Sequence, residues 1–502
     1  MRKKVIGMKR KLQHWTLILL LGSMFWFGWQ NRVMAIAQLP SADTRHILER
    51  LSFGITSEQM QQAEDLGIEA YIENQLNPKL VSESPVLIDY LKQLDFIDLK
   101  PVEIQKKEVA LRQQLKNPKI SSQRQIEIEE QLSDIRRNVS NEAVNSHLAR
   151  AIYSNRQLQE VMVDFWFNHF NVYIDKGPIK FWINDYESQI RNNAFGKFQD
   201  LLTMTAKHPA MQVYLDNKFN IAPNSSNGLK NKRGLNENYA RELMELHTLG
   251  VDGGYTQDDV IVLARIFTGW SASIYNKEVE KRGFIFYQDR HDSQDKVFLG
   301  RQISAGGIEE GEIALDILAN HPATARNISY KLAQYFVADE PPSSLVDLLT
   351  QKFLDSEGDI KVVLNTLIHS SEFNDPQYYK QKFKTPYQYL VSLVRMAEIE
   401  RPNTKRIQGM LTKLSMPVYK CSAPTGYKNT RSAWLNPQAM LQRTSFAMAI
   451  ARKSLNEDYQ IKPQQLQTNL GETSQHTKQV ISKSPQSLRS ALMMGSPEAM
   501  YR

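Results

Sequence analysis

Residues 236–270, NENYARELMELHTLGVDGGYTQDDVIVLARIFTGW, decide how the middle of this chain folds. Apolar side chains three and four positions apart predict a helix from residue 238 to residue 249. Glycines at 250, 253 and 254 end this helix, because glycine adopts positive φ angles without steric cost. Thr256 and Asp259 have the spacing of a capping box and predict the start of a second helix. The segment therefore predicts two helices joined by a glycine turn.

The same helical spacing recurs through most of the chain. Leu158, Val161, Met162 and Phe165 form one apolar stripe, and similar stripes follow residues 328 and 362. The main exception is a pair of aromatic and β-branched runs, 284–288 and 297–299, which predict a small β-hairpin. We therefore expect a mainly α protein, with one large helical domain over residues 38–455 that carries this hairpin.

Three further segments differ in composition from this domain. Residues 101–138 are rich in Lys, Arg, Glu and Gln and are interrupted at Pro118, which predicts an inserted helical hairpin. This hairpin is either a solvated spur or a partner-binding arm. Residues 456–484 show no periodicity and predict a polar linker. Residues 485–502 predict a C-terminal helix that packs back on the domain.

The first 37 residues have the pattern of a signal peptide. A basic start is followed by an uncharged, mostly apolar run over residues 15–29, and Ala35 and Ala37 supply the small side chains of a cleavage site before Gln38. The apolar run is shorter than the roughly 20 residues that a spanning helix needs. We expect export to the periplasm or the outside of the cell. An uncleaved anchor over residues 15–29 is the alternative.

The charge of the chain lies mostly in this leader. Removing residues 1–37 takes away seven of the 62 basic residues and none of the 54 acidic residues, so the formal charge falls from +8 to +1. A nearly neutral surface offers no broad attraction for phosphate backbones, which argues against nucleic acid as a partner. The chain has a single cysteine, Cys421, so no disulfide within the chain is expected.

The predicted helix over residues 238–249 holds the densest group of candidate catalytic residues. Glu242 and Glu245 lie one turn apart on one face, where a partly closed site would raise one pKa or bind a divalent cation between them. Arg241 precedes Glu245 by four residues, so a structural ion pair is the alternative. The two glutamates are therefore the candidate site for a divalent metal cofactor.

Other candidate residues come from the same segment and from two distant ones. We expect His169 and His291 to act as acids or ligands, although His169 also fits a core position on its apolar stripe. The expected substrate-binding residues are Asn236, Asn238, Trp270 and Asp292. For Asp292, backbone bonding in a turn is the alternative.

Several of these blocks resemble one bacterial family, catalogued as domain of unknown function 1800. The family usually carries a stretch very similar to residues 236–246, followed by G-Y-T and T-G-W, here at 254–256 and 268–270. Residues 165–170, FWFNHF, resemble its F-W-H-N-H-F block, with Phe167 in place of the first histidine. Further resemblance lies at residues 291–292, 423–427, 434–437 and 495–498. The resemblance runs from about His46 to the end, with 101–138 as an insertion, and implies one family domain but no reaction.

Two functions fit these observations. The first is an exported hydrolase that acts on an envelope or extracellular polymer, with a carboxylate as base or metal ligand, a histidine as acid and Arg241 as clamp. The second is a non-enzymatic exported module that binds a partner or helps assembly, in which the polar residues form an interhelical network. The absence of a nucleophile elbow, an HExxH motif or a phosphate-binding glycine loop favours the second, whereas the clustering of polar residues favours the first, which is the function we expect.

Overall fold

The computed structural model describes residues 44–274 and 276–502. The predicted signal peptide at residues 1–37, including the apolar run 15–29, lies outside these residues. Among the residues described, no helix has both the length and the apolar character needed to cross a membrane.

The described chain is mainly α, which confirms the expected fold class. The first half contains α2 (Thr44–Leu51), α3 (Ser57–Leu66), α4 (Ile68–Leu76), α5 (Pro85–Leu91), α6 (Pro101–Leu115), α7 (Ser122–Tyr153), α8 (Gln157–His169), α9 (Ile183–Asn193), α10 (Phe198–Lys207), α11 (Pro209–Tyr214), α12 (Ser226–Asn231), α13 (Asn238–Glu242) and α14 (Gln257–Ile266), with short helices η1 (Pro78–Leu80), η2 (Gly177–Phe181), η3 (Asn217–Phe219) and the π-helix η4 (Leu243–His247).

The second half contains α15 (Ile308–Ala319), α16 (Pro322–Phe336), α17 (Ser343–Asp355), α18 (Ile360–Ile368), α19 (Pro386–Met396), α20 (Thr404–Lys413), α21 (Arg431–Trp434), α22 (Pro437–Ala451), α23 (Pro463–Leu470), α24 (Gln475–Lys483), α25 (Gln486–Met494) and α26 (Pro497–Met500), with short helices η5 (Val279–Lys281), η6 (Gln288–Arg290) and η7 (Pro376–Tyr378). Its strands are β1 (Trp270–Ser273), β2 (Gly283–Phe286), β3 (Lys296–Phe298) and β4 (Arg301–Ile303).

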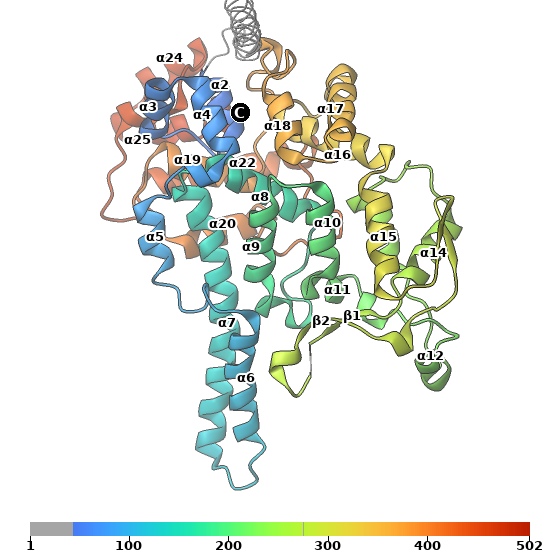
Figure 1. The fold of residues 1–502 in the computed structure, drawn as a ribbon. Helices are drawn as coiled ribbons and strands as arrows, with labels where there is room; N and C mark the ends of the chain where they lie inside the picture. Colours follow the sequence, from blue (N-terminus) through green and yellow to red (C-terminus); the bar gives the residue numbers. More distant parts are fainter. Residues whose placement is uncertain (1–43, 275) are drawn as a thin grey trace, which may run out of the picture. The chain divides into compact units, whose positions relative to one another are not determined.

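Helices α8 and α19 form the centre of the core. Every residue of α19 is buried, and Val161, Met162 and Trp166 of α8 have no exposed surface. Because α8 and α19 are buried along most of their length, other helices must surround them. Figure 1 shows how the chain achieves this: the blue helices α2–α4 and the red helices α24 and α25 lie together on one side, although they come from opposite ends of the sequence.

The two predicted β runs form strands, but the predicted pairing is wrong. Strand β2 pairs with β1, with Trp270 opposite Phe286, and β3 pairs with β4, with Val297 opposite Gln302. The two runs do not pair with each other because the residues between them do not form a tight turn. Instead, His291 and Lys296 bond the buried carboxylate of Glu310, and these contacts fix the segment that connects the two runs.

The expected helical hairpin is present, but its second helix does not end at residue 138. The break falls near Pro118, and α7 then continues to Tyr153, where Leu148 and Ala149 have no exposed surface. In Figure 1 the hairpin of α6 and α7 extends away from the other helices, and the second half of α7 enters them. The hairpin is therefore continuous with the core.

Segment 456–484 also differs from the prediction, because α23 and α24 lie where a polar linker was expected. Leu466 and Leu470, four residues apart, are buried, and the buried Asn469 donates a hydrogen bond to the carbonyl of Met396 at 2.9 Å. Two apolar residues one turn apart are enough to fix a short helix against α19 when a side-chain amide also anchors it.

Candidate functional site

The predicted helix over residues 238–249 changes type in the middle. Helix α13 ends at Glu242, and the π-helix η4 follows directly, so its hydrogen bonds connect residues five apart instead of four. Three successive carbonyls near its end accept side-chain hydrogen bonds: that of Leu246 from Lys331 at 2.8 Å, that of His247 from His169 at 3.1 Å, and that of Thr248 from Asn327 at 2.7 Å. Side chains of α8 and α16 thus complete a helix end that lacks backbone partners.

The charged residues of this segment are paired with one another. Arg241 lies 3.1 Å from Glu237 and 3.6 Å from Glu245, and it donates to Gln257 at 2.9 Å. Burial, with the neighbouring Glu245, raises the pKa of Glu242, and Arg241 opposes this shift. The ion-pair alternative for Arg241 is therefore present in the structure, while Glu242 is a half-buried carboxyl group with an altered pKa.

The expected substrate-binding residues Asn236 and Asn238 are used to hold the loop before the helix. Asn236 donates to the carbonyl of Asp216 at 3.4 Å, and Asn238 donates to that of Leu215 at 3.1 Å. Trp270 has no exposed surface, and a Cβ at Gly311 would lie 2.4 Å from its ring. The ring therefore packs against a helix that only glycine allows to come so close.

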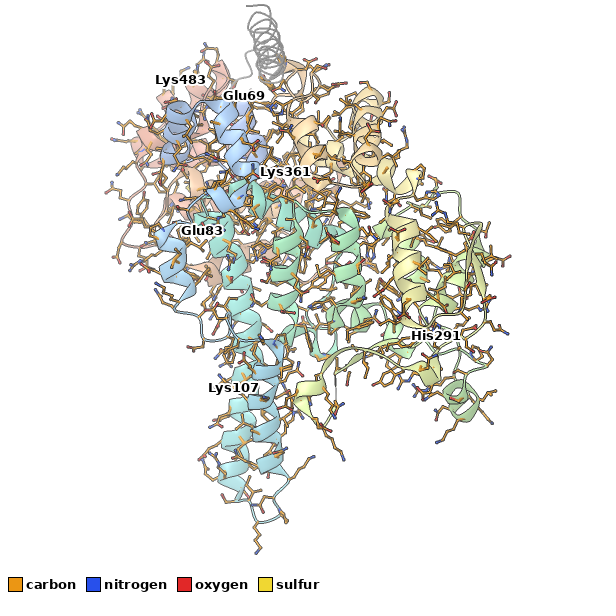
Figure 2. The ribbon with its side chains drawn as sticks, viewed as in Figure 1. Glu69, Glu83, Lys107, His291, Lys361 and Lys483 are labelled. Atoms are coloured by element: carbon orange, nitrogen blue, oxygen red, sulfur yellow. The ribbon has the colours of Figure 1, made fainter. Side chains whose placement is uncertain are left out.

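The residues His291 and Asp292 belong to a separate buried ion cluster. Glu310, at 0% exposure, accepts hydrogen bonds from His291 at 3.0 Å and Lys296 at 2.5 Å, and from the backbone N–H of Gly306 at 2.9 Å. Asp292 is paired with Arg265 at 2.8 Å. Figure 2 shows His291 beside the helix that Figure 1 labels α15. The cluster fastens the irregular segment between β2 and β3 to α15.

Among the predicted catalytic residues, His169 lines a cavity beside α8. This cavity has a volume of about 180 Å³ and lies between α8, α16, the start of α19 and the segment 416–429. Its walls include Asp164, Asn168, His169, Lys331, Tyr335, Gln388, Tyr427 and Lys428. Glu242, Glu245, Arg241 and His291 do not line it, so the structure does not bring the predicted set together at this cavity.

Two asparagines next to His169 hold the wall of the cavity in place. Asn168 accepts a hydrogen bond from the N–H of Tyr427 at 2.7 Å and donates to the carbonyl of the same residue at 2.8 Å. Asn171 donates to the carbonyls of Cys421 and Ala423 at 3.0 and 2.9 Å. Hydrogen bonds therefore join segments 165–170 and 423–427, which are distant in the sequence, and both segments line the cavity.

The cavity contains ionisable groups with altered pKa values. Burial raises the pKa of Asp164, which accepts a hydrogen bond from the Tyr335 hydroxyl at 3.2 Å. Burial lowers the pKa of Lys331 to about 8. Burial and then Lys331 lower the pKa of His169, whose Nε2 must donate to the carbonyl of His247, so its Nδ1 faces Lys331 at 3.3 Å as the acceptor.

A smaller cavity of about 40 Å³ adjoins the first and shares Asp164, Asn168 and Tyr427 with it. His147, on α7, lines this second cavity, and its Nδ1 lies 2.8 Å from the buried carboxylate of Glu187. Burial by itself would lower the pKa of His147, but Glu187 outweighs burial and the pKa is raised.

Glu187 is itself fixed on several sides. Arg191 donates to it at 2.6 Å and bonds Glu160 as well, and the Tyr419 hydroxyl donates to the same carboxylate. Burial would raise the pKa of Glu187, but His147 and Arg191 lower it strongly, so the group is ionised. A carboxylate held in this way fixes the orientation of the imidazole, as in catalytic acid–base pairs.

Four residues in and around these cavities are not among those predicted from the sequence: Asp164, His147, Glu187 and Lys331. Asp164 and Lys331 lie within helices whose apolar stripes predict only a buried face. The available signal was Asp164, a carboxylate within the otherwise apolar run 161–167, because such a charge needs a buried partner or a cavity.

Neither cavity has the side chains of a metal site. Within residues 44–274 and 276–502, no three His, Cys, Asp or Glu side chains are grouped so that they could hold a metal ion.

Comparison with known proteins identifies one relationship. A model of the family described as "Protein of unknown function (DUF1800)" matches residues 46–501, which is nearly the whole chain. No curated protein and no solved structure matches the chain. The matched range includes α8, the π-helix, the buried ion cluster and the loop at 423–427. The chain therefore belongs to the DUF1800 family.

Proposed function

We propose that this protein is an exported hydrolase whose reaction takes place in the two adjoining cavities beside α8 and the segment 416–429. The observation that carries the proposal is the presence of two ionisable groups, His147 and Asp164, on the wall of one small cavity. Both have raised pKa values, for different physical reasons. Pairs of titratable groups with altered pKa values in a cleft are typical of acid–base sites.

The two groups have complementary roles in this proposal. The Asp164 carboxylate, a stronger base than an ordinary aspartate because its pKa is raised, removes a proton from the attacking water. The His147 imidazolium, held by Glu187, gives a proton to the leaving group. Solvent then returns the proton from Asp164 to His147, so the reaction consumes one water molecule. Lys331, with its lowered pKa, supplies a positive charge that favours an anionic transition state.

The size of the cavity limits the substrate. At about 180 and 40 Å³, the two adjoining cavities are smaller than the roughly 300–1,000 Å³ of a typical ligand pocket. A terminal unit or a side group of a polymer fits such a space, whereas a continuous chain does not. The proposed substrate is therefore an end or a substituent of an envelope or extracellular polymer, reached after export and removal of residues 1–37.

The test is an activity screen on purified envelope polymer, with release of reducing ends, amines and carboxylic acids measured separately. Asp164→Asn and His147→Gln are compared with Asp258→Asn, which changes an exposed carboxylate on α14. The proposal predicts a loss of about 10²-fold or more for the two cavity variants and none for the control. No release by the native protein, or equal release by all variants, would overturn it.

A non-enzymatic module is the second candidate. It is favoured by the family's shared polar residues, because Asn236, Asn238, Arg241 and Asp292 all bond neighbouring parts of the protein. In that case these polar residues stabilise the fold, and Glu242 and Glu245 have no catalytic role. Absence of any release by the folded native protein in the same screen, together with loss of folding after Asn238→Ala, would support this candidate.

A further inference from the structure

A groove outside the proposed active site has a strongly positive lining. Its volume is about 490 Å³, and it lies where α6 and α7 meet η2 and the connection between β1 and β2. Figure 1 shows this connection beside α6, and Figure 2 labels Lys107 on the same helix. The basic residues on its lining are Arg112, Arg136, Lys180 and Arg282, and Glu108 is its one carboxylate among the described residues.

Glu108 does not neutralise this group. Arg112 and Arg136 both bond the same oxygen, Oε1, at 3.1 and 2.6 Å through Nη2, while Arg282 bonds Gln105 and a backbone carbonyl. Lys180 has no carboxylate within ion-pair distance in the described part of the chain. Four positive charges therefore face one negative charge, in a chain whose formal charge is nearly zero after loss of residues 1–37.

The groove also contains hydrogen-bond donors that lack partners. Gln105 is 2% exposed, and its Nε2 has no hydrogen-bond partner although its Oε1 accepts from Arg282 at 2.7 Å. An unsatisfied buried donor costs about 1–3 kcal/mol. The Nη1 groups of Arg112 and Arg136, whose side chains are 53% and 37% exposed, make no hydrogen bond to the protein within residues 44–274 and 276–502 and remain open to a ligand. An anion with planar oxygens would satisfy these donors.

Apolar side chains in the same lining narrow the choice of anion. Val109, Pro178, Phe181 and Ile274 share the groove with the cations. A phosphate makes no use of such a surface and a sugar ring offers it only a weakly apolar face, whereas a peptide can place carboxylates and fully apolar side chains at alternate positions. Electrostatic complementarity of this kind selects partners and speeds their association.

We propose that this groove binds an acidic peptide segment of a partner protein, with carboxylates on Arg112, Arg136, Lys180 and Gln105 and an apolar side chain on Phe181. The α6–α7 hairpin is then a partner-binding arm instead of a spur that only keeps the chain in solution. This site is separate from the cavity at Asp164, so the interaction does not depend on the proposed hydrolase activity.

The test uses the purified protein and a short fluorescein-labelled peptide that alternates glutamate with leucine, followed by fluorescence anisotropy. We expect Lys180→Glu and Arg112→Gln each to raise the Kd for the peptide by about tenfold or more. The Kd of the native protein should also rise as the salt concentration increases. Lys119→Glu, at the exposed tip of the hairpin, is the matched control and should change the Kd by less than about twofold. Circular dichroism tests whether each variant is folded. Because the Arg112 side chain is exposed, Arg112→Gln should leave the fold intact.

Three results would overturn the proposal. The first is equal binding of a peptide with glutamine in place of glutamate, which would show that charge is not recognised. The second is an equal effect of Lys180→Glu, Arg112→Gln and Lys119→Glu, which would place binding elsewhere. The third is more effective competition by polygalacturonate than by unlabelled peptide, which would assign the groove to an acidic polysaccharide.

Discussion

Glu310→Gln tests the importance of the buried ion cluster for folding. In the native protein the Glu310 carboxylate lies between His291 and Lys296, and the side chains of all three residues have 0% exposure. The substitution removes the negative charge and leaves the Lys296 ammonium buried without a counter-ion. Removing one partner of a buried pair costs about 3–5 kcal/mol. We therefore expect the free energy of unfolding to fall by about 3–5 kcal/mol.

The assay is urea unfolding followed by tryptophan fluorescence, with Glu309→Gln as the control. Glu309 is the preceding residue on α15 and makes no ion pair within the described residues. The structure predicts a clearly lower midpoint for Glu310→Gln and a change of less than about 0.5 kcal/mol for Glu309→Gln. Equal midpoints for the two variants would refute the view that the cluster holds the segment between β2 and β3.

The same cluster gives a pH dependence with a defined sign. His291 and Lys296 outweigh burial and lower the pKa of Glu310 from 4.5 to about 2. A carboxyl group whose pKa is lower in the folded state stabilises the protein above its unfolded pKa, and this stabilisation is lost as the pH falls from about 4.5 to about 2. Glu310→Gln should remove this part of the acid dependence, while Glu309→Gln should keep it.

Three further predictions concern the cavity and the leader. Glu187→Gln removes the charge that raises the pKa of His147, so the alkaline limit of any activity should move to lower pH, as a pH–rate profile would show; an unchanged limit would exclude His147 as the acid. Gly426→Ala should lower the free energy of unfolding by about 2–4 kcal/mol, because Gly426 has a φ of 68° and a new Cβ would lie 2.3 Å from the carbonyl oxygen of Asn168. Urea unfolding measures this change, and a decrease below about 0.5 kcal/mol would contradict the prediction. Export with cleavage predicts a mature mass that lacks residues 1–37, and an intact mass would favour the anchor.

Local signals in the sequence were sufficient for much of the fold. The capping box is present, because Thr256 accepts from the N–H of Asp259 at 3.2 Å and the Asp259 side chain accepts from the N–H of Thr256 at 2.8 Å. The break near Pro118 was also predicted, since proline disrupts a helix through its own ring. Features of this kind depend on residues within one turn of each other, so no tertiary information is needed.

Other features depended on contacts between distant segments. The π-helix after Glu242 has no marker in its own sequence, since it is stabilised by Lys331 and His169 from other helices. The prediction of the strand pairing was wrong for a similar reason, because the buried Glu310 fixes the segment between β2 and β3. A single sequence records neither contact.

The proposed acid–base pair was the least predictable feature. His147 and Asp164 lie on two consecutive helices, and neither is part of a recognised motif. His147 becomes a candidate only because Glu187 of α9 packs against it, and Asp164 only because a cavity lies beside it. The polar residues around Glu242 are close together in the sequence, which is a weaker indication of a site than closeness around a cavity.

The most direct test compares Asp164→Asn with Glu242→Gln on the same polymer substrate, with the rate of hydrolysis per folded molecule as the measurement. If the reaction takes place in the cavity, Asp164→Asn should lower the rate by about 10²-fold or more, and Glu242→Gln should leave it within about threefold of the native rate. The opposite result, with loss of activity only in Glu242→Gln, would contradict the cavity assignment and place the chemistry on α13.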